Sequence, residues 1–213
     1  MGRRVTVVTS RKNTLIIFAR YPRAGEVKTR LGAEIGMEKA AEVYRQLAEG
    51  TFAIAGELAG MVRSCLFYEP SASIHEMRKW VGDGLELFPQ EGEDLGERMR
   101  NVFRKVFDEG ANASLIVGTD IPDLDAGLVR KGFEHLEREP VVVGPSVDGG
   151  YYLLGMQKGV GDLFSGVRWS SQHVLADTLA RVSNLGLSCG LLPELADIDT
   201  KEDWERFLLN QRS

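Results

Sequence analysis

The chain has 213 residues, of which 43% are hydrophobic and 27% are charged, and its formal net charge is −5 with a pI near 5.4. This length and composition fit one compact globular domain with a single sizeable core. The negative balance argues against a general nucleic-acid or membrane surface, because such surfaces need an excess of positive charge.

The first residues, MGRRVTVVTSRKNT, are basic but lack the continuous apolar core of a signal peptide, and no later run reaches membrane-spanning length. We therefore expect a cytoplasmic protein with a single domain over residues 1–213, in which residues 1–13 form a peripheral segment. Cys65 and Cys189 lie in apolar, strand-like runs without a CxxC motif nearby. Buried reduced thiols are expected there, rather than metal ligands or a disulfide.

Short apolar runs alternate with amphipathic stretches along the chain. Strands are predicted at 14–20, 61–69, 85–90, 114–120, 140–145, 151–156 and 187–193. Helices are predicted at 37–59, 73–81, 95–108, 125–139, 171–185 and 201–210. This alternation predicts a three-layer α/β/α domain with a mainly parallel sheet. The runs 140–145 and 151–156 leave no room for a crossover helix, so the sheet is predicted to be mixed, with at least one antiparallel strand.

Some helix ends and loops follow from local chemistry. Thr200 and Asp203 have the spacing of a capping box, and Gly186 follows a predicted helix as a C′ glycine does. Ligands of open α/β sheets bind beyond the carboxyl ends of the strands. The loops expected to converge there are 21–30, 90–98, 119–123 and 147–150.

The loop after the first strand, within FARYPRAGEVKTRLGAEIG, is unusually basic. It carries Arg20, Arg23, Lys28 and Arg30 together with Gly25. Glycine allows a backbone to approach a ligand closely, and Lys and Arg contact phosphate oxygens. A solvated basic loop is the alternative, but the position directly after the first strand favours a phosphate-binding loop. The sequence fits neither the Walker A pattern nor GxGxxG.

The stretch GTDIPDL ends the fourth predicted strand with Asp120 and Asp123. A carboxylate at a strand end is a hard oxygen ligand that suits Mg²⁺, which commonly takes one or two carboxylates plus substrate phosphates. Either aspartate could instead cap the next helix. The residues alone leave both interpretations of Asp120 open, and Asp123 is expected to be mainly structural.

The stretch PSVDGGYYLLGM places Asp148 before Gly149 and Gly150. An Asp-Gly turn is a common hairpin device. Two glycines ahead of tyrosines could equally let a sugar or a second substrate lie against the backbone. In this second interpretation Gly149, Gly150 and Tyr151, together with Trp169 further along the chain, form the acceptor or sugar side.

The stretch QEGEDLGERM follows the third predicted strand. Gln90 and the backbone from Asp94 to Gly96 could read a base edge, and Arg98 could reach a phosphate. Asp94 as an N-cap with Glu97 at N3 would explain both acids without any ligand. This capping interpretation is favoured for the two carboxylates.

Taken together, FARYPRAGEVKTRL, DLGERM, GTDIPDL, GPSVDGGYYLLGM, WSS and DIDTKEDW resemble the DUF2064 family. Its members are small bacterial and archaeal proteins with the glycosyltransferase A, or nucleotide-diphospho-sugar transferase, fold. Some are labelled arsenosugar-biosynthesis or radical-SAM/selenodomain-associated transferases. The resemblance runs from about Thr14 to Phe207, with the motifs in the family's order.

The resemblance implies roles for several of these residues. The loop after the first strand would wrap the nucleotide, with Lys28 and Arg30 best placed for its diphosphate. Asp120 matches the metal-binding aspartate, although D-x-P stands here in place of a full DxD motif. Asp148 is the expected second metal ligand and catalytic carboxylate, and the alternative is a base or an acceptor anchor.

The resemblance further implies a Mg²⁺- or Mn²⁺-dependent glycosyltransferase that moves a sugar from a nucleotide-diphospho-sugar to a small acceptor. The metal would neutralise charge on the leaving nucleoside diphosphate. One alternative is a nucleotidyltransferase that attacks the α-phosphate of a nucleoside triphosphate and releases pyrophosphate. Another is a non-catalytic module that binds nucleotide sugars.

Overall fold

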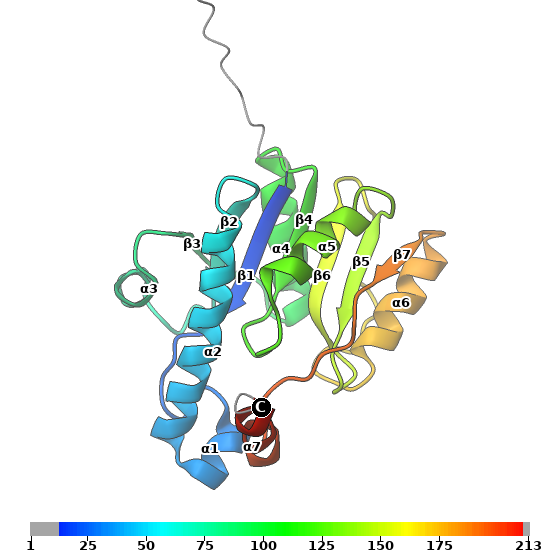
Figure 1. The fold of residues 1–213 in the computed structure, drawn as a ribbon. Coiled ribbons are helices and arrows are strands. Elements are labelled where there is room, and N and C mark those ends of the chain that lie inside the picture. The colour runs from blue at the N-terminus through cyan, green and yellow to red at the C-terminus, as the bar shows by residue number, and fades with distance from the viewer. Residues whose placement is uncertain (1–12, 211–213) are drawn as a thin grey trace, which may run out of the picture.

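The computed structural model describes residues 13–210 (Figure 1). Its strands are β1 (Asn13–Ala19), β2 (Arg63–Tyr68), β3 (Glu86–Pro89), β4 (Ala113–Val117), β5 (Val141–Pro145), β6 (Tyr151–Gln157) and β7 (Cys189–Leu191). Its helices are α1 (Thr29–Ile35), α2 (Met37–Glu57), α3 (Ile74–Val81), α4 (Leu95–Asp108), α5 (Ala126–His135), α6 (Val174–Asn184) and α7 (Lys201–Asn210). The predicted strands and helices are confirmed with small differences at their ends, whereas α1 was not predicted.

The strands form one seven-stranded sheet in the order β3-β2-β1-β4-β6-β5-β7. β6 runs antiparallel to both β4 and β5, and the other neighbouring pairs are parallel. The prediction of a mixed, mainly parallel sheet is therefore confirmed. The short connection between β5 and β6 is the reason, since antiparallel neighbours can be joined by a tight turn.

Helices cover both faces of the sheet. Successive side chains of β1 point to opposite faces, so Leu15 packs in one apolar cluster with Ile54 of α2 and Val129 of α5. Ile16 packs in the other cluster, with Phe103 of α4 and with side chains of α6. Figure 1 shows α2 and α5 on one side of the sheet and α4 on the other. The three-layer α/β/α prediction is confirmed.

The segment between β7 and α7 returns across the carboxyl edge of the sheet (Figure 1). Within it, the Ile198 N–H donates a 3.2 Å hydrogen bond to the Asp120 carbonyl, just beyond β4. The Ile198 side chain is buried with Leu31 of α1 and Val43 of α2. This anchoring brings the start of α7 to the ends of β1 and β4.

Capping interactions mark the ends or the starts of several helices, as predicted. Gly186 follows α6 with φ +68°. Thr200 and Asp203 exchange the two hydrogen bonds of a capping box at the start of α7. Asp125 caps α5 by accepting from the Leu128 N–H. Neither Asp120 nor Asp123 therefore caps that helix.

Two further predictions concern the termini and the cysteines. The peripheral segment predicted at residues 1–13 lies almost wholly outside the described residues. Both cysteines are free, Cys65 being buried and Cys189 partly buried. Between residues 13 and 210, every helix is too short or too polar to cross a membrane.

Candidate active site

A cleft of about 700 Å³ opens at the carboxyl ends of β1 and β4. It is lined by the loops after β1, β3 and β4, which were three of the four loops expected to converge. The fourth, residues 147–150, does not line it. Tyr44, Ser170 and Asp199 complete the lining instead.

Lys28 connects two carboxylates inside this cleft. Its Nζ atom lies 2.8 Å from Asp199 Oδ1 and 3.2 Å from Asp120 Oδ2. The Lys28 side chain is only 3% exposed, whereas those of Asp120 and Asp199 are 46% and 41% exposed. Burial alone lowers the pKa of the Lys28 ammonium, but the two carboxylates outweigh it and hold this pKa above its ordinary value. Lys28 is therefore a fixed positive charge.

The backbone at Lys28 is left-handed, with φ 46° and ψ 46°. For a residue with a side chain this conformation costs about 1–2 kcal/mol. Helix α1 begins at the next residue without a side-chain cap, and the Gly32 N–H donates to the Lys28 carbonyl. The chain therefore accepts strain at the residue that carries the buried ammonium.

Asp120 has one oxygen left without a partner. Its Oδ1 atom is buried and accepts no hydrogen bond from residues 13–210. No cluster of three or more His, Cys, Asp or Glu side chains suited to a metal occurs in this part of the chain. Asp120 and Asp199, however, both contact Lys28 and thus lie close together. Two carboxylates fit Mg²⁺ or Mn²⁺ when substrate phosphates supply further oxygens.

Tyr44 joins the loops after β1 and β4. Its hydroxyl accepts a 2.8 Å hydrogen bond from the Arg20 N–H and lies 3.0 Å from Thr119 Oγ1. Burial, with a further contribution from the Asp120 carboxylate, raises the pKa of Tyr44 to about 12. The neutral hydroxyl therefore fixes the floor of the cleft at neutral pH.

The predicted basic loop divides into two groups. Arg20, Lys28 and Arg30 line the cleft. Arg23 does not, because its guanidinium pairs with Glu26 at 3.0 Å and with Glu76 of α3 at 2.9 Å. Gly25 also lies outside the lining, in a turn with φ +81°.

The loop after β3 lies along the opposite wall. Gln90, Asp94 and Arg98 line the cleft. The Gln90 Nε2 donates to the Phe67 carbonyl at 2.9 Å, and the Arg98 Nε donates to the Gly92 carbonyl at 3.2 Å. Asp94 caps α4 by accepting from the Glu97 N–H at 2.8 Å, which confirms the capping interpretation.

Asp148 sits in the β5–β6 turn, outside the cleft lining. Its Oδ1 accepts from Ser146 Oγ and from the Gly150 N–H at 2.9 Å, and Gly149 adopts φ +87°. The hairpin interpretation of this stretch is thus confirmed. The segment before Asp197 is tied to this turn, because the Val147 N–H donates to the Leu195 carbonyl at 3.1 Å. Burial and the charges of Asp199 and Asp148 raise the pKa of Asp197.

The two aromatic residues assigned to the acceptor side are largely packing residues. Tyr151 directs its hydroxyl to Met99 Sδ at 3.8 Å, and burial raises the pKa of this hydroxyl. Trp169 packs on Phe164, with ring centroids 6.3 Å apart, and covers Gly96. Neither aromatic ring nor Gly96 lines the cleft.

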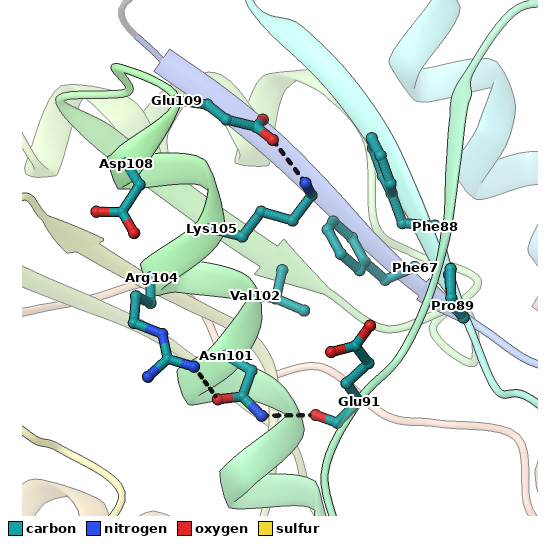
Figure 2. Close-up of a pocket in the computed structure, with 10 residues that line it drawn as sticks. All are labelled: Phe67, Phe88, Pro89, Glu91, Asn101, Val102, Arg104, Lys105, Asp108 and Glu109. Carbon is teal, nitrogen blue, oxygen red and sulfur yellow. Dashed lines mark hydrogen bonds and ion pairs between the residues drawn. The ribbon is translucent and has the colours of Figure 1, made fainter.

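A second groove of about 460 Å³ lies between β3 and α4 (Figure 2). Three of its charged side chains have partners within the chain: Lys105 pairs with Glu109 at 2.7 Å, and Arg104 donates to Asn101 at 3.0 Å. The Lys105 ammonium also lies 4.6 Å from the centre of the Phe88 ring. This groove lacks the strained lysine and converging carboxylates of the cleft, which makes the cleft the candidate active site.

Three cleft residues, Tyr44, Ser170 and Asp199, were missed by the sequence analysis. Asp199 belongs to the stretch DIDTKEDW, for which the sequence analysis predicted only a family resemblance and a helix cap. The signal that could have found it is a pair of aspartates immediately before a capped helix. Tyr44 falls within the apolar pattern of α2 and is indistinguishable there from a core residue.

The chain is similar to a known sequence family and to several solved structures. Residues 54–171 match the DUF2064 family, described as uncharacterized proteins conserved in bacteria. No curated protein matches the chain. A candidate nucleotide-diphospho-sugar transferase of Desulfovibrio desulfuricans G20 has a similar structure, with 32% identity, a TM-score of 0.89 and coverage of 95% of this chain and 88% of that one.

More distant structures share the fold. CMP:2-keto-3-deoxy-manno-octonic acid synthetase complexed with CTP has 15% identity and a TM-score of 0.60, over 95% of this chain and 100% of that one. Glucosyl-3-phosphoglycerate synthase of Mycobacterium tuberculosis, in complex with Mn²⁺, UDP and glucosyl-3-phosphoglycerate, has 11% identity and a TM-score of 0.58, over 95% and 77%. The fold is thus the glycosyltransferase A-like fold that was expected. On the sequence match and the similarity to the Desulfovibrio protein, the chain belongs to the DUF2064 family.

Proposed function

We propose that this protein is a metal-dependent glycosyltransferase that moves a sugar from a nucleotide-diphospho-sugar to a small acceptor. The observation that carries the proposal is the meeting of Lys28 with Asp120 and Asp199 at the carboxyl edge of the sheet. Ligands of open α/β sheets bind at this edge. The similarity to the Desulfovibrio protein adds support, because that protein is described as a candidate nucleotide-diphospho-sugar transferase.

The proposed roles follow from charge and position. Arg20, Lys28, Arg30 and Arg98 offer cationic groups to the diphosphate, while Gln90, in the loop after β3, is available to the base. Asp120 and Asp199 would hold Mg²⁺ or Mn²⁺, and a bound metal would neutralise charge developing on the leaving phosphate oxygens. Complexes of similarly folded proteins with manganese support a divalent metal.

The acceptor is proposed to enter from the β5–β6 turn. Asp148 of this turn and Asp199 of the cleft both act on Asp197, and with burial they raise its pKa. A carboxylate in this position could anchor an acceptor hydroxyl or accept its proton. The predicted role of Asp148 as a second metal ligand remains a prediction, beside Asp199 as the nearer partner of Asp120.

Nucleotidyl transfer is the second candidate. The observation that favours it is the shared fold with a synthetase complexed with CTP, whose length the alignment covers completely. The same cationic wall would then hold a triphosphate. Release of pyrophosphate from a nucleoside triphosphate plus a phosphorylated or acidic small molecule would favour this candidate, whereas release of a nucleoside diphosphate from a nucleotide sugar favours the first.

A thermal-shift screen of nucleotides and nucleotide sugars, with and without Mn²⁺, tests the proposal. A ligand that binds only the folded state raises its apparent stability. We expect at least one nucleotide sugar to raise the midpoint more strongly with Mn²⁺, and Asp120→Asn to remove this Mn²⁺-dependent part. Asp108→Asn, a carboxylate of the second groove, is the control that should leave it intact. Midpoints unaffected by every ligand would contradict the proposal.

A further inference from the structure

Lys28 already pairs with one oxygen of each cleft carboxylate, Asp120 and Asp199. The Oδ1 atom of Asp120 is buried, while the side chain as a whole is 46% exposed. The other oxygen, Oδ2, is the one that Lys28 Nζ approaches at 3.2 Å. On Asp199, the same ammonium lies 2.8 Å from Oδ1. One side chain thus covers an oxygen of each carboxylate.

The backbone that carries this ammonium has an unusual conformation. Lys28 is one of two residues other than glycine with positive φ among residues 13–210, the other being Ser170. Glycine would adopt this conformation without strain, so the lysine side chain must matter at this position. Strained residues of this kind cluster at ligand sites and switches.

We propose that Lys28 is an exchangeable internal counter-ion, which neutralises Asp120 and Asp199 when no ligand is bound and moves to a substrate phosphate before these carboxylates hold a divalent cation. The inference rests on the proposed function and specifies how that site is regulated. In this order of binding, the Lys28 ammonium and the metal compete for the oxygens of Asp120 and Asp199.

The exchange follows from charge balance. Two carboxylates and one ammonium leave a single net negative charge, and a second cation at the same oxygens is repelled by the first. Phosphate oxygens offer the ammonium an equivalent partner. Metal and nucleotide are then expected to strengthen each other's binding, and such coupling is reciprocal for equilibrium affinities.

Arg30, two residues further along in the first turn of α1, provides a matched comparison. Its Nη1 atom lies 3.8 Å from Asp199 Oδ2, but its side chain is 80% exposed. Exposed pairs are weak because solvent screens them. Removing Arg30 thus deletes one positive charge beside the same carboxylate without uncovering an oxygen that Lys28 holds.

The test measures Mn²⁺ binding to the full chain without nucleotide, from the paramagnetic resonance signal of free Mn²⁺. Lys28→Met keeps the apolar stem and removes the charge. A neighbouring opposite charge changes the proton affinity of a carboxylate about ten- to a thousandfold, so we expect Lys28→Met to bind Mn²⁺ at least about tenfold more tightly than wild type. Arg30→Met should change this affinity by no more than about threefold, and Asp120→Asn should abolish binding.

Equal Mn²⁺ affinity in wild type and Lys28→Met, with loss only in Asp120→Asn, would overturn the exchange and leave the proposed metal site standing. Weaker binding in Lys28→Met, or no binding to any form, also overturns the exchange. The Mn²⁺-dependent thermal shift with a nucleotide sugar then decides separately whether the metal belongs to the proposed function. Circular dichroism checks the fold of each variant. Lys28→Gly, which relieves the left-handed strain, makes the same comparison where Lys28→Met does not fold.

Discussion

The indole of Trp169 covers Gly96 so closely that a Cβ atom added at Gly96 would lie 2.3 Å from the ring. Gly96 is in the first turn of α4, next to residues that line the cleft. Trp169 precedes Ser170, which also lines the cleft. This packing contact therefore ties together two walls of the candidate site.

Gly96→Ala is expected to destabilise the protein by about 1–3 kcal/mol, the usual cost of overpacking a filled site. Gly50→Ala in α2 is the matched control, because a Cβ at Gly50 meets nothing within 4 Å. In an exposed helix interior that change should stabilise by about 0.5–1 kcal/mol. Urea titrations measure the free energy of unfolding of both variants. If Gly96→Ala is no more destabilising than Gly50→Ala, the close-contact interpretation is wrong.

Arg98→Ala should weaken UDP binding by about ten- to a hundredfold, since charge-assisted hydrogen bonds contribute about 1.5–3 kcal/mol. Uridine, which lacks phosphate, should bind with nearly unchanged affinity. Arg104→Ala is the control on the same helix, because Arg104 lines the second groove and not the cleft. Calorimetry measures these affinities. If UDP does not bind, a nucleotide found in the thermal-shift screen takes its place. Equal losses from both arginines would contradict the assignment of the cleft.

Cys65 should make stability fall at alkaline pH. Burial raises the pKa of its thiol from 9.0 to about 12. Below pH 9 the thiol is protonated in both states, so its full contribution is present. As pH rises from 9 towards 12 the unfolded state ionises first, and the free energy of unfolding falls by up to about 1.4 kcal/mol per pH unit.

Urea titrations of wild type and Cys65→Ala at pH 7, 9 and 10.5, under reducing conditions, test this expectation. The stability advantage of wild type should shrink across the two higher values. Burial raises the pKa of the Cys189 thiol to about 11. The stability advantage of wild type over Cys189→Ala should therefore shrink in the same way, over a narrower pH range. Parallel curves for wild type and Cys65→Ala would show that the thiol does not titrate differently in the two states.

Asp148→Asn is expected to lower turnover by orders of magnitude while costing little stability, because asparagine can also accept the hydrogen bonds of the turn. A rise in the Mn²⁺ concentration needed for half-activity would identify a metal ligand. A lower maximal rate with that requirement unchanged would identify a base or acceptor anchor. Wild-type turnover would restrict Asp148 to the hairpin.

Much of the fold could be predicted because local pattern and tertiary structure agree. The β5 and β6 runs are separated by too few residues for a crossover, which forces an antiparallel pair. Gly186 and the pair Thr200 and Asp203 end or begin helices by chemistry that spans a few residues. The convergence of three loops followed from strand direction alone.

The features that the sequence did not predict depend on tertiary contacts, which local sequence patterns do not indicate. Helix α1 has seven residues, contains Gly32 and follows a left-handed lysine, so its stability comes from packing rather than propensity. Asp199 reaches the cleft because Ile198 is anchored beside Asp120. Arg23 leaves the cleft for Glu76, a partner on α3 that charge and loop position cannot reveal.

The contact between Lys28 and Asp199 joins residues 171 positions apart in sequence. A loop of that length closes only when the intervening sheet is assembled. A chain in which the segment before α7 is undocked has Lys28 and Asp120 but lacks the second carboxylate. Completion of the fold and acquisition of the ligand site are therefore one event, and a bound ligand protects the docking of this last segment as much as it occupies the cleft.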